Sequence, residues 1–382
     1  MSDSLPQEIV DAIIDELKDY QHDLKSCSLT CRSFVPQTRV HLFTTIELSS
    51  NKRCQQFVSM RSSSPHDLSV YIKGLRINFL RSDLTSQNLL GVLASLTVHH
   101  ITLERLKWGN LTPDMQQALC MSFPHLRSIS LIHVIFPSYQ TVCGFMGGFP
   151  ELKGLSLSDA RVLTAGDHSM DYNRRSIRLM ELSIVRATSI FGITSAVSPI
   201  SFKHLRSLKF TWSILNDLGT LQSILLAARP NLQELVLNQA PSYGEIGPVT
   251  EFPRDLRIQG LHRLQVEMWD GNMWGGTPEF EHLDAWIDIF RCSAGHVPRD
   301  VSFHLCLSSN AVVENPEQGL GAWSSLDEVL SAATESFESL SVVIYGIQMV
   351  EAAQFKAVLE TQLPRLKHRG MLDVRCKSFL SR

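Results

Sequence analysis

The sequence predicts an α/β fold in which short parallel strands alternate with outer helices, preceded by a small bundle of three helices. Two observations carry this prediction. A short apolar phrase returns at a nearly constant interval through the middle of the chain, and the amino-terminal segment has the apolar periodicity of amphipathic helices. The chain has 382 residues, of which 44% are hydrophobic, so it has enough apolar surface for a large core.

The recurring phrase has the form L-x-x-L-x-L, with other bulky apolar residues also occupying the L positions. It reads LERLKWGNL at 103, LRSISLIHV at 126, LKGLSLSDA at 152, LMELSIVRA at 179, LRSLKFTWS at 205, LQELVLNQA at 232 and LHRLQVEMW at 261. From Leu126 to Leu261, successive leading leucines lie 26, 27, 26, 27 and 29 residues apart. This interval is typical of leucine-rich repeats, whose strand-plus-helix units stack into a solenoid.

The segments between the phrases have helical patterns. One such pattern comprises Leu218, Leu221, Leu225 and Ala228, which recur at helical spacing before the phrase at 232. We expect clean repeats over about 100–268. IKGLRI and Ile46–Leu48 indicate degenerate strands before them, and VSFHLCL, FESLSVVIY and GMLDVRC indicate longer, irregular repeats over about 269–382.

The amino-terminal segment predicts three helices. Ser4 and Gln7 have capping-box spacing and Pro6 suits a first turn, so a helix is expected from about Leu5. Its apolar positions form a stripe wide enough to face two neighbours: Ile9, Ile13 and Leu17, with Val10 and Ile14 beside them. A second helix is expected from Asp23 and a third through Phe34 to Phe43. So small a bundle rarely stands alone, so its exposed apolar face is expected to bind a partner.

The stretch LPQEIVDAIIDELKDYQHDLKSCSLTCRSFVPQTRVHLFTTIEL resembles the F-box, particularly the version common in fungal F-box proteins. The resemblance is carried, in order and at family spacing, by Leu5-Pro6, Glu8-Ile9, Ile13, Leu17, Asp23-Leu24, Cys27-Ser28-Leu29, Cys31-Arg32 and Phe34. It implies an F-box over 1–48 that packs into a Skp-type adaptor, and through it joins a cullin ligase. The residues implied to form or support that interface are Leu5, Pro6, Ile9, Leu24, Leu29 and Phe34. F-box proteins often carry leucine-rich repeats behind the F-box, which fits a repeat body over 49–382.

The residues expected to bind a target lie beside the inward leucines or on a loop with aromatic residues. Alternation along strands and aromatic content select Ser130, Ser156, Ser183, Lys209, Thr211, Asn238, Trp269 and Trp274. Three stretches do not fit the repeat and are expected to be loops: Arg161 to Ser176, Ala240 to Arg257, and Trp269 to Phe280. The alternative for the Trp269 loop is that its rings cover one end of the core. For Arg174, Arg175 and Arg178, a solvated loop is favoured over a phosphate site.

Composition and motifs argue against several classes of function. The net charge of -3 disfavours nucleic acid and anionic membrane as partners, and no apolar run reaches the length of a membrane helix. The eight cysteines lack C-x-x-C spacing and are expected to be reduced, buried hydrophobes, so no metal is expected. No nucleotide-binding, metalloprotease or nucleophile-elbow motif occurs, so neither a cofactor nor catalysis by this chain is expected.

These observations together predict a non-catalytic, intracellular protein, cytoplasmic or nuclear, that recruits a target protein to a ubiquitin ligase. The sequence does not identify the target or any modification on it. One alternative is an F-box scaffold or regulator that acts outside degradation. A second is a repeat protein whose amino-terminal helices merely cap the repeats. A third is an α/β enzyme, which the regular spacing of the phrases disfavours.

Overall fold

The computed structural model describes residues 5–63, 68–79, 86–93, 96–164, 176–187, 190, 200–212, 215–239, 256, 258–269, 283–293, 296–307, 321–333, 337–346 and 349–378. The chain divides into two compact units. The first comprises Met1–Ile177 with Ser195–Ile200, and the second comprises Arg178–Thr194 with Ser201–Arg382. Within the described residues, no helix is both long and apolar enough to cross a membrane.

The first unit begins with helices and continues as alternating strands and helices. Its elements are α1 (Gln7–Glu16), α2 (Gln21–Thr30), η1 (Arg32–Phe34), α3 (Val35–Phe43), β1 (Thr45–Leu48), α4 (Asn51–Ser63), η2 (Leu68–Tyr71), β2 (Gly74–Asn78), α5 (Ser86–Leu93), β3 (His100–Glu104), η3 (Trp108–Asn110), α6 (Pro113–Met121), β4 (Ser128–Ile132), β5 (Ile135–Ser138), α7 (Tyr139–Met146), β6 (Gly154–Ser158) and β7 (Arg161–Thr164). Strands β1, β2, β3, β4 and β6 pair in that order, all parallel.

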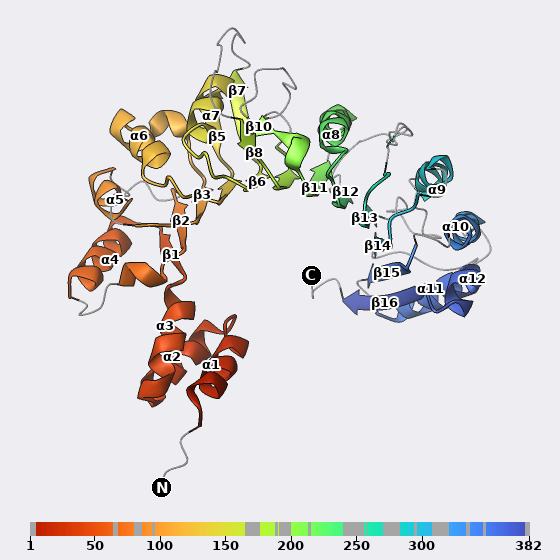
Figure 1. Cartoon of the computed structure of the whole chain (residues 1–382), viewed down its shortest axis with the longest axis horizontal. Coiled ribbons are helices and arrows are strands. Elements are labelled where there is room, and N and C mark those ends of the chain that lie inside the picture. The colour runs from red at the N-terminus through yellow and green to blue at the C-terminus, as the bar shows by residue number, and fades with distance from the viewer. Residues whose placement is uncertain are drawn as a thin grey trace. The chain divides into compact units, whose positions relative to one another are not determined.

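Helices α4 to α7 lie on one side of this sheet (Figure 1). The side chains that point toward them are apolar and buried, as at Ile129 and Leu131 of β4, while the alternate residues of the strand are half-buried. Trp108, Phe136 and Phe145 pack together in this layer, with ring centroids 4.9–5.9 Å apart. The opposite face of the sheet is covered by none of the described helices of this unit.

The second unit repeats the arrangement with longer strands. Its elements are β9 (Glu181–Val185), η5 (Phe202–His204), β11 (Ser207–Trp212), α8 (Leu215–Ala228), β12 (Glu234–Gln239), β13 (Arg263–Trp269), α9 (Leu283–Cys292), β14 (Asp300–Cys306), α10 (Gly321–Ala332), β15 (Ser339–Gly346), α11 (Met349–Gln362), α12 (Pro364–His368) and β16 (Leu372–Ser378). Short strands β8 (Ile177–Arg178) and β10 (Ile200–Ser201) fall where the chain passes between the units. The seven longer strands pair in chain order, all parallel.

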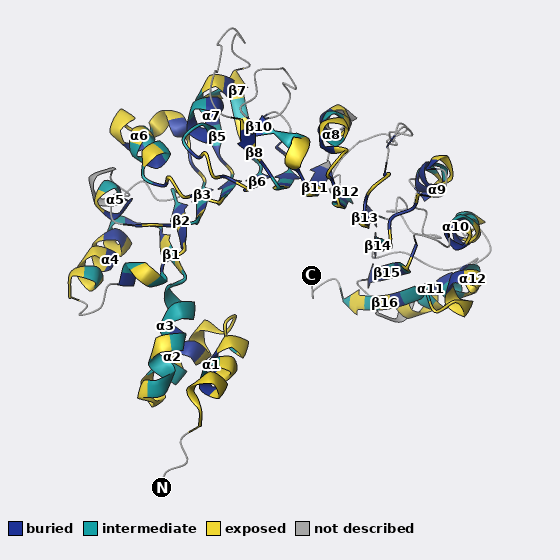
Figure 2. Cartoon of the chain, viewed as in Figure 1, coloured by how far each residue is buried: buried dark blue, intermediate teal, exposed yellow. Residues whose placement is uncertain are grey.

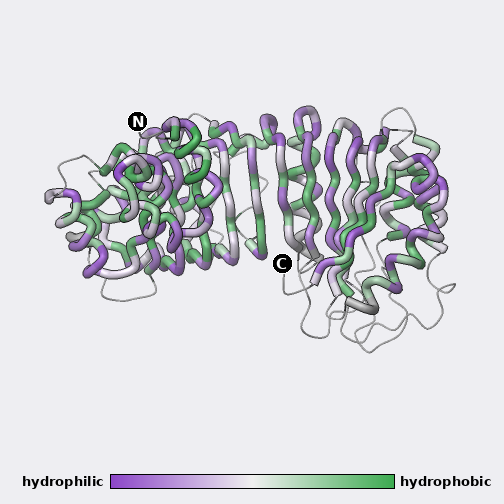
Figure 3. The backbone as a smooth tube through the Cα atoms, turned by 90° about the horizontal axis from the view of Figure 1, so that it is seen from below, coloured by the Kyte–Doolittle hydropathy of each residue, from purple (hydrophilic) through white to green (hydrophobic). Residues whose placement is uncertain are grey.

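The core of the second unit lies between its strands and helices α8 to α12. Figure 3 shows these strands side by side, with hydrophilic and hydrophobic residues succeeding one another along the backbone. Phe303 of β14 and Trp323 of α10 are fully buried and meet edge to face at 6.0 Å. Asp327 of α10 is also buried, and its carboxylate accepts the backbone N–H groups of Arg365 and Leu366, at 3.1 and 2.9 Å, in the first turn of α12.

The structure confirms the predicted α/β class with a large parallel sheet. All the leading leucines from Leu126 to Leu261 are buried, as predicted. The phrase at 103 was placed wrongly, because β3 spans His100–Glu104 and Trp108 lies in a 3-10 turn after it. The buried positions of that repeat are Val98, Ile101 and Leu103. β-Branched residues replace two of the leucines there, which hid the register.

Three further local predictions need correction. Helix α1 begins at Gln7, with Pro6 as its N-cap rather than in its first turn, and the Gln7 amide donates to Asp11 and to the Ser33 carbonyl; Ser4, on which the predicted capping box depends, lies outside the described residues. Residues Arg161–Thr164 form strand β7, paired with β5, and are not a loop. Two cysteines are exposed, Cys31 and Cys292, so the expectation of uniformly buried thiols was wrong.

A tight turn recurs at the end of four successive strands. Arg105, His133, Asp159 and Arg186 directly follow β3, β4, β6 and β9, and each has a positive φ between 49° and 55°. Left-handed backbone is unfavourable for residues with a Cβ atom. The repetition of this turn therefore shows that neighbouring strands end in the same way despite their different sequences.

Candidate protein-binding surfaces

The amino-terminal bundle has one apolar stripe inside and another outside. On α1, Val10 and Ile14 are buried against the rest of the bundle. Leu5, which precedes the helix, and Ile9 and Ile13 on it lie one turn apart, and they are 61%, 47% and 49% exposed. Figure 2 shows α1 and α2 mostly exposed, whereas most strands of the same unit alternate between buried and half-buried residues. The outer stripe is thus apolar surface that no described part of the bundle covers.

The other predicted interface residues divide in the same way. On α2, Leu24 is 0% exposed and Leu29 is 88% exposed, so the first supports the bundle and the second is available to a partner. Pro6 is exposed, and Phe34 of η1 is half-buried. The structure therefore places Leu5, Pro6, Ile9 and Leu29 on the surface and Leu24 in the interior.

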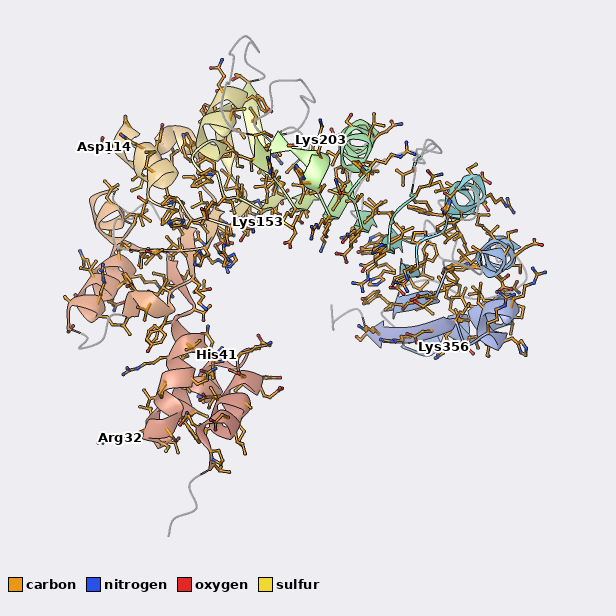
Figure 4. The ribbon with its side chains drawn as sticks, viewed as in Figure 1. Arg32, His41, Asp114, Lys153, Lys203 and Lys356 are labelled. Carbon is orange, nitrogen blue, oxygen red and sulfur yellow. The ribbon has the colours of Figure 1, made fainter. Side chains whose placement is uncertain are left out.

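Polar contacts tie α1 to α3. The Asp15 carboxylate accepts a hydrogen bond from Gln37 at 2.5 Å and lies 2.7 Å from Nε2 of His41. The hydrogen bond from Gln37, followed by that from His41, lowers the pKa of Asp15 below its ordinary value of 3.8. Figure 4 shows His41 on α3 and Arg32 at the start of η1. This network fixes the pose of α1, and hence of its outer stripe.

The face of the first unit's sheet that points away from helices α4 to α7, here called its open face, carries polar side chains in register. Ser130 and Ser156 are opposite each other on β4 and β6, and Thr102 of β3 is opposite Ser130. Beside them, Glu104 accepts two hydrogen bonds from the Arg76 guanidinium, at 2.7 and 3.2 Å. Arg76 thereby lowers the pKa of Glu104.

The open face of the second unit is formed by the alternate residues of its longer strands. Ser183 of β9 is opposite Lys209 of β11, and Thr211 is opposite Asn238 of β12. The Asn238 amide donates to the Thr211 hydroxyl at 3.5 Å. Lys209 is exposed and therefore accessible to a partner. Thr211 is buried, so its side chain is not accessible on this face.

Trp269, predicted as a possible aromatic anchor, is the last residue of β13 and packs against residues of the neighbouring strands β14 and β15. Its indole N–H donates to the buried carboxylate of Glu267 at 3.1 Å. Its ring packs on a buried cluster formed by Cys306, Val343 and Tyr345. These contacts favour the alternative in which Trp269 covers the end of the core. Trp274 lies outside the described residues, as do Arg174 and Arg175.

No protein-family model matches this chain, and no curated protein is significantly similar to it. The candidate surfaces consequently rest on the residues and their geometry. Among the described residues, no group of three or more His, Cys, Asp and Glu side chains is arranged to hold a metal ion.

Sequence reasoning missed several residues on the open face of the second unit. His304 is opposite Glu267, and Arg375 continues the same row through Val343. The His304 and Tyr345 rings lie 5.7 Å apart. Their strands were expected, but the alternation that selected the earlier face residues was not extended to them, although it would have identified these positions.

Proposed function

We propose that this chain is the substrate-recognition subunit of a Skp–cullin–F-box ubiquitin ligase. Residues 1–48 act as the F-box that binds a Skp-type adaptor, and residues 49–382 act as a leucine-rich-repeat-like solenoid that binds a target protein. The chain itself makes and breaks no bonds. It raises the effective concentration of the target near a separate ubiquitin-transferring enzyme and orients the two.

The observation that carries this proposal is the outer apolar stripe of the bundle. Leu5, Ile9, Ile13 and Leu29 remain exposed although the bundle has an interior formed by Val10, Ile14 and Leu24. Several large apolar side chains exposed on so small a module are typical of a protein interface. The F-box resemblance covers the same residues, and it supplies a Skp-type adaptor as the partner.

Parallel strands that pair in chain order, with helices α4 to α7 of the first unit and α8 to α11 of the second between most neighbouring strands, support the solenoid reading of the body. Repeat proteins of this kind bind partners through extended faces, because each repeat contributes a few side chains to one surface. The open faces of both units carry polar and charged residues suited to that role. The target remains the partner to be found.

Co-purification with a Skp-type adaptor tests the proposal. We expect the full chain to bind the adaptor, and the double variant Ile9→Asp, Leu29→Asp to lose at least about tenfold in affinity, because charges would be buried at the interface. Leu226→Asp is the matched control, since Leu226 on α8 is 74% exposed and lies in the other unit. That control should bind like the original chain.

Two outcomes would remove the ligase role. One is failure of the folded original chain to bind the adaptor; the other is undiminished binding by the double variant. Circular dichroism of each variant establishes that it is folded. If the adaptor binds but no target is degraded in a cullin-dependent way, the protein is an F-box scaffold instead.

A further inference from the structure

Four basic residues occupy equivalent places at the amino-terminal edge of the first unit's sheet. Lys73, His99, Arg127 and Lys153 each directly precede a strand, namely β2, β3, β4 and β6. We refer to these four residues as the basic row. The chain as a whole carries a net charge of -3, so an uninterrupted row of basic side chains does not follow from its composition.

Backbone hydrogen bonds hold the basic row in line. The N–H of His99 donates to the Lys73 carbonyl, that of Arg127 to the His99 carbonyl, and that of Lys153 to the Arg127 carbonyl, each at 2.8 Å. Neighbouring strands lie about 4.8 Å apart, so the four residues span roughly 14 Å. The spacing of the charges is therefore set by the sheet.

The basic row is accessible and its charges are uncompensated. Lys73, Arg127 and Lys153 are exposed and His99 is half-buried. Figure 4 shows Lys153 beside β6, whereas Asp114 lies on the outer helix α6. Within the described residues, no ion pair involves the two lysines or the arginine of the row.

The acidic residue that is closest to the row in sequence has another neighbour. Glu151, two residues before Lys153, lies 3.4 Å from Nδ1 of His125. His100, one residue into β3, reports the local charge: burial first, and then repulsion from His99 and Arg127, lower its pKa. His99 and Arg127 of the row are thus close enough to act on His100.

The corresponding row of the second unit is different. The residues that precede β9, β11, β12, β13 and β14 are Met180, Arg206, Gln233, His262 and Arg299. Neutral residues interrupt this row, and Arg299 forms an ion pair with Glu338. The same backbone position therefore carries four consecutive basic residues only in the first unit, where Thr44, before β1, ends the row.

We propose that the basic row of the first unit is a docking site for an acidic, Asp/Glu-rich segment of a partner protein, bound in extended conformation across the strand ends. An extended chain rises about 3.3 Å per residue, so about five residues cover the row. The proposal rests on the proposed function only in assigning this segment to the recruited target.

The composition of the row favours a run of carboxylates over a single phosphate. Bidentate phosphate recognition relies on converging arginines, and the row contains one arginine, two lysines and a histidine in a line. Lysines and arginine spaced one per strand, with a histidine between them, match a series of monovalent anions. A row of about 14 Å is also short for nucleic acid, which proteins bind through many phosphate contacts.

Fluorescence anisotropy with a labelled peptide of about six glutamates tests the proposal, with the same peptide carrying glutamines as the control. We expect the intact chain to bind the glutamate peptide only, and to bind it more weakly as salt rises from about 50 to 200 mM. Arg127→Glu with Lys153→Glu should weaken binding about tenfold or more. Lys203→Glu with Arg206→Glu makes the same change of charge at exposed residues of the second unit and should leave binding intact.

Several results would overturn the proposal. They are absence of binding by the intact chain at low salt, equal losses in the two double variants, equally tight binding of an oligonucleotide of the same charge, and binding of a phosphoserine peptide but not of the glutamate peptide. If the charge-reversed protein fails to fold, Arg127→Gln with Lys153→Gln replaces it. Adaptor binding should persist in these variants, and peptide binding should persist in Ile9→Asp, Leu29→Asp, so failure of one proposal is separable from failure of the other.

Discussion

The helical bundle and the sheet-containing body differ in how far their leucine side chains are buried. In the body, the leading leucines from Leu126 to Leu261 are all buried beneath helices. In the bundle, Leu24 is buried but Leu5 and Leu29 are exposed, as are Ile9 and Ile13. A repeat body buries its apolar face because each unit covers its neighbour. A bundle of three short helices has no such neighbour for its second face.

The ends of the helices differ as well. None of the three bundle helices α1, α2 and α3 has a side-chain hydrogen bond at its N-cap. In the body, Thr112 caps α6 and Ser138 caps α7 by accepting backbone N–H groups. The carboxylate of Asp327, on α10, accepts backbone N–H groups at the start of α12. The body thus caps several of its helices with its own side chains, whereas α1, α2 and α3 begin without such caps.

The largest expected effect is in the core of the body. Phe303→Ala should lower the free energy of unfolding by about 3–5 kcal/mol, because the ring is fully buried against Trp323 and its loss leaves a cavity. Urea unfolding followed by tryptophan fluorescence measures this change. Leu226→Ala, at an exposed position on α8, should change it by less than about 0.5 kcal/mol. Similar losses at both positions would mean that the core is not as described.

Two leucines of α2 test the bundle directly. Leu24→Ala should cost about 2–4 kcal/mol of bundle stability, because Leu24 is fully buried. Leu29→Ala should cost almost nothing in stability, since its side chain is exposed, but it should weaken adaptor binding. Hydrogen exchange of the bundle amides measures the first effect and co-purification the second. A loss of stability at Leu29 equal to that at Leu24 would contradict the inside–outside assignment.

Loss of the Asp327 carboxylate, which caps α12, is expected to lower the free energy of unfolding by less than loss of the Phe303 ring. Asp327→Ala should cost about 2 kcal/mol, because two backbone N–H groups at the start of α12 lose their acceptor in a buried place. Asp327→Asn retains one oxygen acceptor and should lose less. Thermal unfolding of both variants provides the comparison, and an Asn variant as unstable as the Ala variant would indicate that the charge is required.

The sequence was sufficient for the parts of the molecule in which one pattern decides the structure. Regular leucine spacing identified the buried positions of β4, β6, β9, β11, β12 and β13, because each strand must present the same side chains to its neighbours. It misplaced β3, where Val98 and Ile101 stand in for leucines. Pairing of β5 with β7 could not be foreseen, because both strands lie outside the L-x-x-L-x-L phrase whose spacing located the main strands.

The candidate surfaces were harder to derive than the fold. Periodicity alone could not say which of the two stripes of α1 faces the bundle, since Val10 and Ile9 are both apolar and only tertiary packing distinguishes them. The basic row escaped notice because its successive members lie 26 to 28 residues apart in sequence and come together only when the strands align.

The pH response should distinguish the contacts of α1 from the apolar packing of the bundle. Asp15 has a pKa below 3.8 in the folded chain, so the stability it contributes is present above the unfolded pKa and is lost as pH falls through the folded pKa. Asp15→Asn should lower stability near neutrality, where the charged carboxylate contributes, and its difference from the original chain should shrink as pH falls below about 4. An NMR titration of the Asp15 carboxyl in Gln37→Ala should show a raised pKa. An unchanged pKa in that variant would exclude Gln37 as its main cause.

The smallest expected effect concerns backbone strain, which the described residues show only in the body. Arg105 has φ of 55° directly after β3, and its N–H donates to the Ile132 carbonyl at 2.8 Å, so neighbouring strands hold it in the left-handed conformation. Arg105→Gly and Arg105→Ala both remove the exposed side chain, but only glycine adopts this conformation without steric cost. The glycine variant should therefore be more stable than the alanine variant by about 0.5–1 kcal/mol in thermal unfolding. Equal stability would mean that the turn relaxes on substitution, and that the body holds its strand ends less firmly than its repeated geometry implies.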